Sequence, residues 1–328
     1  MKLLLKISII TVFCFFVMNN IHAQLVTPID GVTIALDDSN PKPEQDVEVY
    51  IESYNFDLNS SSIVWFVDGK VQNQGIGVTR TNITSPKIGL TTNVLVKIKG
   101  SDGREVNKSI SIKSGSVDII WESDGYYPAF FKGKLPFSHE NKIKLIAIPH
   151  LAKDKTREID PKTLVYSWKL GGKYIDNGQG YGKQVVFVNA GEIPKTLDIS
   201  VDVSNREQTE HTVGLITLNS DSPTLSFYEQ DALYGILFNK SLSGNVPLIN
   251  TEMKIIAVPF GFNLKNKDVT YNWSVNGINQ EDLQRNRSIV VRTKGDTGGS
   301  SSINLDIRNQ DNILQGANGG FMVNFNKK

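Results

Sequence analysis

Histidines and glycine-rich loops are the first patterns in this chain to test for chemistry. His139, His150 and His211 stand in three different local settings, without a second histidine or an acidic residue at metal-ligand spacing. Zinc sites depend on such spacings, because several ligands must reach one ion. The sequence therefore predicts no zinc site.

A phosphate-binding loop is also not expected. Residues 178–183 read Gly-Gln-Gly-Tyr-Gly-Lys, but Asn177 stands where the first glycine belongs and Gln184 replaces the Ser or Thr. No helix is predicted to follow, so the segment is interpreted as a glycine-rich hairpin. A Gly-x-Ser-x-Gly nucleophile elbow is absent as well. We expect no catalytic residues and no cofactor.

Carboxylates leave one alternative open. Asp37 with Asp38, and Asp231 with Glu229, have the oxygen ligands that calcium prefers at a junction between domains. Solvated surface carboxylates are the other interpretation of the same residues.

An aromatic cluster is the candidate binding patch. Trp121 precedes Tyr126, Tyr127, Phe130 and Phe131 within a short stretch. Such a cluster is typical either of a contact patch for a ligand or partner or of packing between neighbouring domains. Both interpretations stay open at this stage.

The first residues have the pattern of an export signal. Lys2 and Lys6 flank an apolar start, residues 7–18 are uncharged and mostly apolar, and Ile-His-Ala at 21–23 offers a cleavage site before Gln24. We expect a signal peptide over residues 1–23 and an extracellular or cell-surface location. Retention of this leader as an uncleaved anchor is the alternative. The single cysteine, Cys14, lies within the leader, so disulfides cannot stabilise the rest.

Charge excludes one class of partner. The chain has 35 basic and 34 acidic residues, a formal net charge of +1. Nucleic-acid binders carry a basic excess, so none is expected. Membrane contact is expected only if the leader is retained.

Three tryptophans set the number of domains. Trp65, Trp168 and Trp273 are separated by 168 − 65 = 103 and 273 − 168 = 105 residues, each within a similar local sequence. Such a constant period indicates a repeated unit, and its length matches one β-sandwich domain. A tryptophan on the central strand of a sandwich is typically part of the core. We expect these three indoles to be core residues; stacking on a carbohydrate is the alternative.

Alternation and turn dipeptides predict the strands around each tryptophan. An alternating strand precedes each one, at residues 46–51, 142–148 and 252–258, and another alternating strand follows. After each tryptophan comes Asp-Gly, Gly-Gly or Asn-Gly, which favour tight hairpins because these residues tolerate positive φ. No stretch after the leader has a helical period.

The predicted fold is all-β, with three tandem immunoglobulin-like or PKD-like sandwiches. We place them at residues 24–115, 116–219 and 220–328. The second and third share an opening segment that the first lacks. Trp121-Glu-Ser-Asp aligns with Tyr228-Glu-Gln-Asp at an offset of 228 − 121 = 107.

The Tyr-x-Trp-x-hydrophobic-x-Gly segments resemble the third-strand core of PKD-like and bacterial immunoglobulin-like surface domains. The PKD-type Trp-x-Phe-Gly-Asp-Gly form is absent. The paired openings, Trp-Glu-Ser-Asp with Tyr-Pro and Phe-Tyr-Glu with Tyr-Gly, are similar to uncharacterised exported proteins of candidate-phyla bacteria. This resemblance implies proximity to pilus-assembly functions.

Three function classes follow. The leading prediction is a non-enzymatic cell-surface or secreted interaction protein, in adhesion or a pilus-related assembly, with a protein or glycan partner at the cell envelope. The alternatives are a carbohydrate-binding accessory protein and a secreted hydrolase of unrecognised type.

Overall fold

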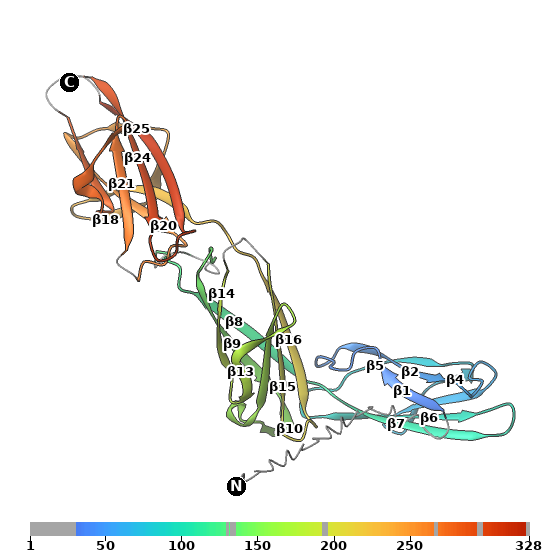
Figure 1. Ribbon diagram of the computed structural model, residues 1–328. Helices are drawn as coiled ribbons and strands as arrows, with labels where there is room; N and C mark the ends of the chain where they lie inside the picture. The colour runs from blue at the N-terminus through green and yellow to red at the C-terminus, as the bar shows by residue number, and fades with distance from the viewer. Residues whose placement is uncertain are drawn as a thin grey trace, which may run out of the picture.

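Three β-sandwiches follow one another along the chain (Figure 1). The computed structural model describes residues 31–128, 131, 136–191, 196–265, 268–293 and 298–325; the predicted leader, residues 1–23, lies outside them. These described residues form strands and two short 3-10 turns, and no α-helix. None of their helical turns is long and apolar enough to span a membrane. The chain is therefore an all-β protein of tandem immunoglobulin-like sandwiches.

The first sandwich packs a three-stranded sheet, in the order β1-β2-β5, against a four-stranded sheet, in the order β4-β3-β6-β7. In constant-type immunoglobulin domains the fourth strand belongs to the sheet of the first two, whereas here β4 pairs with β3 in the other sheet. The strands are β1 (Val32–Leu36), β2 (Asp46–Ser53), β3 (Ser62–Val67), β4 (Lys70–Ile76), β5 (Arg80–Thr84), β6 (Thr91–Lys99) and β7 (Glu105–Lys113).

The second sandwich repeats this topology. Its sheets have the orders β14-β9-β8 and β13-β12-β15-β16, and a small hairpin, β10-β11, is added beside them. The elements are β8 (Ser116–Ser123), β9 (Lys142–His150), β10 (Ala152–Asp154), β11 (Arg157–Glu158), η1 (Pro161–Thr163), β12 (Val165–Leu170), β13 (Lys173–Tyr181), β14 (Val185–Asn189), β15 (Leu197–Ser204) and β16 (His211–Leu218).

The third sandwich is larger. Its sheets have the orders β18-β17-β20-β23 and β19-β25-β24-β21-β22, and β19 pairs with β25 in parallel. The elements are β17 (Thr224–Asp231), β18 (Gly235–Leu242), β19 (Asn245–Leu248), β20 (Glu252–Phe260), β21 (Val269–Val275), β22 (Ile278–Asn279), η2 (Glu281–Leu283), β23 (Ser288–Arg292), β24 (Gly299–Asn309) and β25 (Gly316–Phe325). The predicted boundaries after residues 115 and 219 fall between β7 and β8 and between β16 and β17.

One fully buried tryptophan lies in the core of each sandwich. In every case the indole Nε1–H donates to a backbone carbonyl that lies two residues before the start of β5, β14 or β23, which belongs to the opposite sheet of the same sandwich. The three bonds are Trp65 to Val78 (2.8 Å), Trp168 to Lys183 (2.8 Å) and Trp273 to Asn286 (2.9 Å). The carbonyl of the following residue also accepts a hydrogen bond: Thr79 accepts from the backbone N–H of Ile51, Gln184 from that of Ala147, and Arg287 from that of Ala257. The indole therefore fixes the chain at the point where it crosses between the sheets.

The hairpin turns after the tryptophan strands are confirmed. Both residues of each predicted dipeptide have positive φ, as two-residue hairpins with right-handed strand twist require. The dipeptides are Asp68-Gly69 (48° and 79°), Gly171-Gly172 (54° and 79°) and Asn276-Gly277 (52° and 80°).

The predicted alignment of the two opening strands is wrong by one residue. Ile119 pairs with Ala147 and Phe227 with Ala257, so the offset between β8 and β17 is 227 − 119 = 108, not 107. Side chains alternate along a strand, so a slip of one residue exchanges the two faces. Trp121 consequently packs on the core of its sandwich, whereas the side chain of Tyr228 lies on the other face and contacts Phe238, with ring centroids 5.1 Å apart.

Candidate functional site

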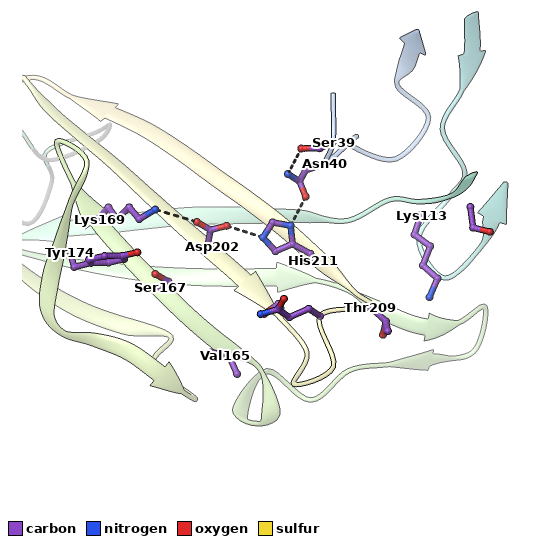
Figure 2. A pocket seen from close by; sticks show the side chains of 13 residues that line it. Ser39, Asn40, Lys113, Val165, Ser167, Lys169, Tyr174, Asp202, Thr209 and His211 are labelled. Carbon is purple, nitrogen blue, oxygen red and sulfur yellow. Dashed lines mark hydrogen bonds and ion pairs between the residues drawn. The ribbon is translucent and has the colours of Figure 1, made fainter. Parts of the chain in front are cut away.

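A polar groove lies between the first and second sandwiches, with a volume of about 910 Å³. The outer face of the sheet β13-β12-β15-β16 forms its floor, and the loop after β1 and the end of β7 form its wall (Figure 2). The side chains that line it are Ser39, Asn40, Ser111, Lys113, Val165, Ser167, Lys169, Tyr174, Asp202, Ser204, Gln208, Thr209 and His211.

Strand alternation brings the floor residues together. On β12, Ser167 and Lys169 flank the buried Trp168 and therefore point away from the core. Ser167 lies directly opposite Asp202 of β15, and Ser204 of β15 lies opposite His211 of β16. Polar side chains on neighbouring strands thus form one continuous surface.

A chain of polar contacts crosses this floor into the first sandwich (Figure 2). Lys169 Nζ lies 3.8 Å from Asp202 Oδ2, and Asp202 Oδ1 lies 2.8 Å from His211 Nε2. His211 Nδ1 hydrogen-bonds Asn40 Oδ1, and the Nδ2 of the same asparagine donates to Ser39 Oγ (3.0 Å). The chain therefore joins the floor to the wall.

The loop of Asn40 is held in place by Asp38. The carboxylate of Asp38 accepts the backbone N–H of Asn40 (2.9 Å) and the side-chain amide of Gln45 (3.0 Å). The carboxylate of Asp37 accepts the backbone N–H of Glu48 (2.9 Å). These carboxylates, which the sequence offered as calcium ligands, cap a turn. Among the residues that the structure describes, no three His, Cys, Asp or Glu side chains lie close enough together to hold a metal ion.

An ion pair between an exposed lysine and a buried glutamate lies at one end of the groove. Lys113 of β7 contacts the carboxylate of Glu210, whose side chain is 7% exposed. The chain passes between the sandwiches here, and Gly115 is packed so tightly that an added Cβ would lie 2.5 Å from Leu151 Cδ2. The first two sandwiches are thus in direct contact along the groove.

Tyr174 is the one exposed aromatic ring in the groove, with 67% of its surface accessible. It stands on the edge strand β13 opposite Lys169, whose ammonium lies 5.1 Å from the ring centroid. The contact is a cation–π interaction and covers part of the ring.

His211 is not placed to activate a nucleophile in the groove. A histidine that activates a nucleophile needs one ring nitrogen directed at that nucleophile. Both ring nitrogens of His211 already have partners, Asp202 and Asn40. The arrangement offers many hydrogen-bond donors and acceptors and no activated nucleophile.

The aromatic cluster predicted from the sequence is divided between two places. Trp121 packs edge-on against Phe137, with ring centroids 5.7 Å apart, at the core of the second sandwich. Tyr126 and Tyr127 instead lie at the joint with the third sandwich. Phe131 contacts Tyr127 (5.1 Å between centroids), and Phe130 lies outside the described residues.

This joint is a backbone pairing. Tyr126 N–H donates to the carbonyl of Phe262 (2.7 Å), and Gly261 N–H donates to the carbonyl of Tyr126 (3.0 Å). The ring of Tyr127 packs on Phe260, with centroids 6.0 Å apart. Burial raises the pKa of the Tyr127 phenol to about 12, and the charge of Asp221 acts in the same direction. The tyrosines therefore contribute to packing between domains.

Glu140 links the same two sandwiches through its backbone and its side chain. Its carbonyl accepts from Asn312 Nδ2 (3.1 Å), and its carboxylate accepts the backbone N–H of Leu314 (2.9 Å). Gln315 Nε2 donates to the carbonyl of His139 (2.8 Å) beside it. These bonds hold the second and third sandwiches end to end, as Figure 1 shows.

The sequence did not identify the groove residues. His150 and His211 do have acidic partners, Asp118 (3.0 Å) and Asp202 (2.8 Å), but across strands and not at a local spacing. The one available signal was the run of polar residues on one face of β15, Ser200, Asp202 and Ser204, where a sheet covered by another element would be apolar.

Comparison with known proteins places the chain in no family. No protein-family model matches the sequence, and no curated protein matches it. The three N-terminal domains of the Highly Immunogenic Outer Capsid protein of bacteriophage RB49 are 12% identical, with 90% of this chain and 99% of that chain covered and a TM-score of 0.27. Fibronectin(III)-like modules of Clostridium thermocellum CbhA are 13% identical over 58% of this chain and 94% of that chain (TM-score 0.28).

A third solved structure, Bacteroides ovatus SGBP-B in complex with a mixed-linkage heptasaccharide, is 9% identical over 89% of this chain and 70% of that chain, with a TM-score of 0.23.

Proposed function

We propose that this chain is a non-enzymatic, exported interaction protein, at the cell surface or secreted, that binds a partner in the groove between its first two sandwiches. The observation that carries the proposal is the groove itself. Two domains build it, a chain of ion-pair and hydrogen-bond contacts from Lys169 to Asn40 joins its floor to its wall, and its histidine is not placed to activate a nucleophile.

The rest of the architecture supports a binding role. The joint at Tyr126 and Glu140 holds the third sandwich in line with the second, so that the groove stands at a distance from the C-terminal end (Figure 1). Such a series of sandwiches suits a spacer that presents a binding face. Adhesion and a pilus-related assembly are the two settings that we propose for it, the second on the resemblance of its domain openings.

A binding assay on cell envelopes tests the proposal. Ser204→Trp would fill the groove from the outer face of β15, where the residue lies opposite His211 and away from the core. The matched control is Ser62→Trp, an exposed strand position of the first sandwich outside the groove. We expect the wild-type protein and Ser62→Trp to bind an envelope fraction in biolayer interferometry, and Ser204→Trp to lose at least about tenfold in affinity. Equal binding by all three proteins, or binding by none, would overturn the proposal.

A further inference from the structure

We infer that the partner of this groove is an uncharged oligosaccharide, which stacks on Tyr174 and hydrogen-bonds Ser167, Asp202 and Ser204. The inference rests on the proposed function and specifies its ligand class. It follows from the polarity of the groove, its charge balance and the positions of two exposed tyrosines, Tyr174 in the groove and Tyr181 beyond it on the same strand.

The residue types in the groove favour a ligand rich in hydroxyl groups. Of the thirteen residues that line the groove, Val165 is the one whose side chain has no polar atom, and Tyr174 adds an aromatic face to its hydroxyl. A lipid, or a peptide that binds through apolar side chains, needs apolar pockets for its tails or side chains. A ligand rich in hydroxyl groups instead needs many donors and acceptors, which the groove has.

Charge balance favours a neutral ligand. Each of the two lysines that line the groove has a carboxylate partner: Lys169 has Asp202, at 3.8 Å, and Lys113 has Glu210. A uronate or sulfate would have to compete with these carboxylates for the ammonium groups. Neutral hydroxyls, by contrast, can both donate to Asp202 and accept from the lysines without disturbing either pair.

An exposed tyrosine completes the site. Tyrosine has a flat apolar face and a polar hydroxyl, so it can cover the C–H face of a sugar while the hydroxyls of that sugar reach polar neighbours. Tyr174 provides this face at the open edge of the sheet, beside Ser167 and Lys169 (Figure 2).

A second exposed tyrosine extends the site along the same strand. Tyr181, 57% exposed, lies opposite Val165, whereas Tyr174 lies opposite Lys169. Residues 175–178 form a bulge opposite Trp168, with Asn177 at φ 58°. In a regular strand, two residues an odd number of positions apart point to opposite faces, but the bulge turns both tyrosines to the outer face. Four residues of β12 separate the two positions, about 13 Å. This length suits several linked sugars and not a monosaccharide.

Isothermal titration of the full mature chain tests the inference. The neutral probes are cellohexaose, laminarihexaose, xylohexaose, mannohexaose and chitohexaose, and the acidic probes are trigalacturonate and a hyaluronan hexasaccharide. We expect at least one neutral probe to bind, and Tyr174→Ala to lower the affinity for that probe at least about tenfold. We expect Tyr181→Ala to lower the affinity for the hexasaccharide more than the affinity for the matching disaccharide.

Tyr54→Ala is the matched control, because Tyr54 is 91% exposed and lies outside the groove. Circular dichroism of each variant verifies folding. Preference for an acidic probe, no binding of any neutral probe, or neutral binding that survives Tyr174→Ala would overturn the inference.

Envelope treatments separate this inference from the proposed function. A glycosidase that cleaves the linkage of the neutral probe that binds destroys that glycan, and protease destroys proteins, so we expect groove-dependent binding to be lost from glycosidase-treated envelopes and kept on protease-treated ones. If binding still depends on Ser204 but survives the glycosidase, the sugar inference fails and the interaction function stands. If the Ser204→Trp variant binds untreated envelopes like wild type, the proposed function itself fails.

Discussion

Each core tryptophan combines burial with one hydrogen bond at the crossing between two sheets. In Trp168→Phe, the carbonyl of Lys183 would lose its donor, and the smaller ring would leave a cavity at a fully buried position. We expect the second sandwich to lose about 2–4 kcal/mol in free energy of unfolding. Urea titration followed by circular dichroism measures this loss. Trp121→Phe, at a half-buried position, is the control, and an equal effect of the two substitutions would contradict the role of the indole bond.

Tyr166 makes the second sandwich sensitive to alkaline pH. Burial, and secondarily the charge of Asp160, raises the pKa of its phenol to about 12, and its hydroxyl donates to the carbonyl of Pro161 (3.0 Å). The folded pKa is above the unfolded value of about 10. The contribution of this group is therefore complete below pH 10 and is lost as the pH rises towards 12.

Urea unfolding at several pH values between 8 and 11.5 measures this loss. We expect the free energy of unfolding of the second sandwich to fall above pH 10, and to fall less in Tyr166→Phe than in wild type. Tyr54→Phe, on the surface of the first sandwich, controls for the removal of a hydroxyl. An identical pH profile for Tyr166→Phe and wild type would count against this explanation.

At the scale of elements, the connection from β7 to β8 determines how closely the first two sandwiches approach. Gly115 leaves no room for a side chain, since a Cβ would also lie 3.2 Å from Thr212 Cβ. We expect Gly115→Val to separate the two sandwiches, to break the Lys113–Glu210 contact and to expose the connection to trypsin at Lys113. Limited proteolysis with mass spectrometry measures the cleavage rate.

The matched control for this prediction is Gly299→Ala, because Gly299 has open space around its Cα. Its cleavage rate at Lys113 should equal that of wild type. If Gly115→Val resists trypsin as well as this control does, the contact between the sandwiches does not depend on the glycine.

At the scale of the whole molecule, the joint at Glu140 couples the second and third sandwiches. Its bonds from Asn312, Leu314 and Gln315 link the two domains beyond the covalent connection. We expect the two sandwiches of the wild-type protein to unfold in one calorimetric transition, and the double variant Glu140→Ala with Gln315→Ala to show two. Glu252→Ala, which removes an exposed ion pair with Arg292 inside the third sandwich, should leave the single transition intact. Separate transitions in the wild-type protein would refute the coupling.

Local patterns in the sequence were sufficient to predict the repeated units. The spacing of Trp65, Trp168 and Trp273, the alternation of the strands around them and the turn dipeptides predict three all-β sandwiches, because strand period and positive-φ turns are properties of neighbouring residues. The alignment of Trp121 with Tyr228 failed, because both faces of the opening strands carry apolar residues and the face of each side chain is set by pairing with β9 and β20.

Only the tertiary structure decided where a ligand could bind. Asp202 and His211 meet across a hairpin, and Asn40 reaches them from another domain, 211 − 40 = 171 residues away in the chain. Tyr126 and Tyr127, which the sequence offered either as a contact patch or as packing between domains, lie at the joint around Gly261. The physical reason is the same in both cases: the groove and the joint are made by contacts between strands and between domains, which no short-range pattern of residue types records.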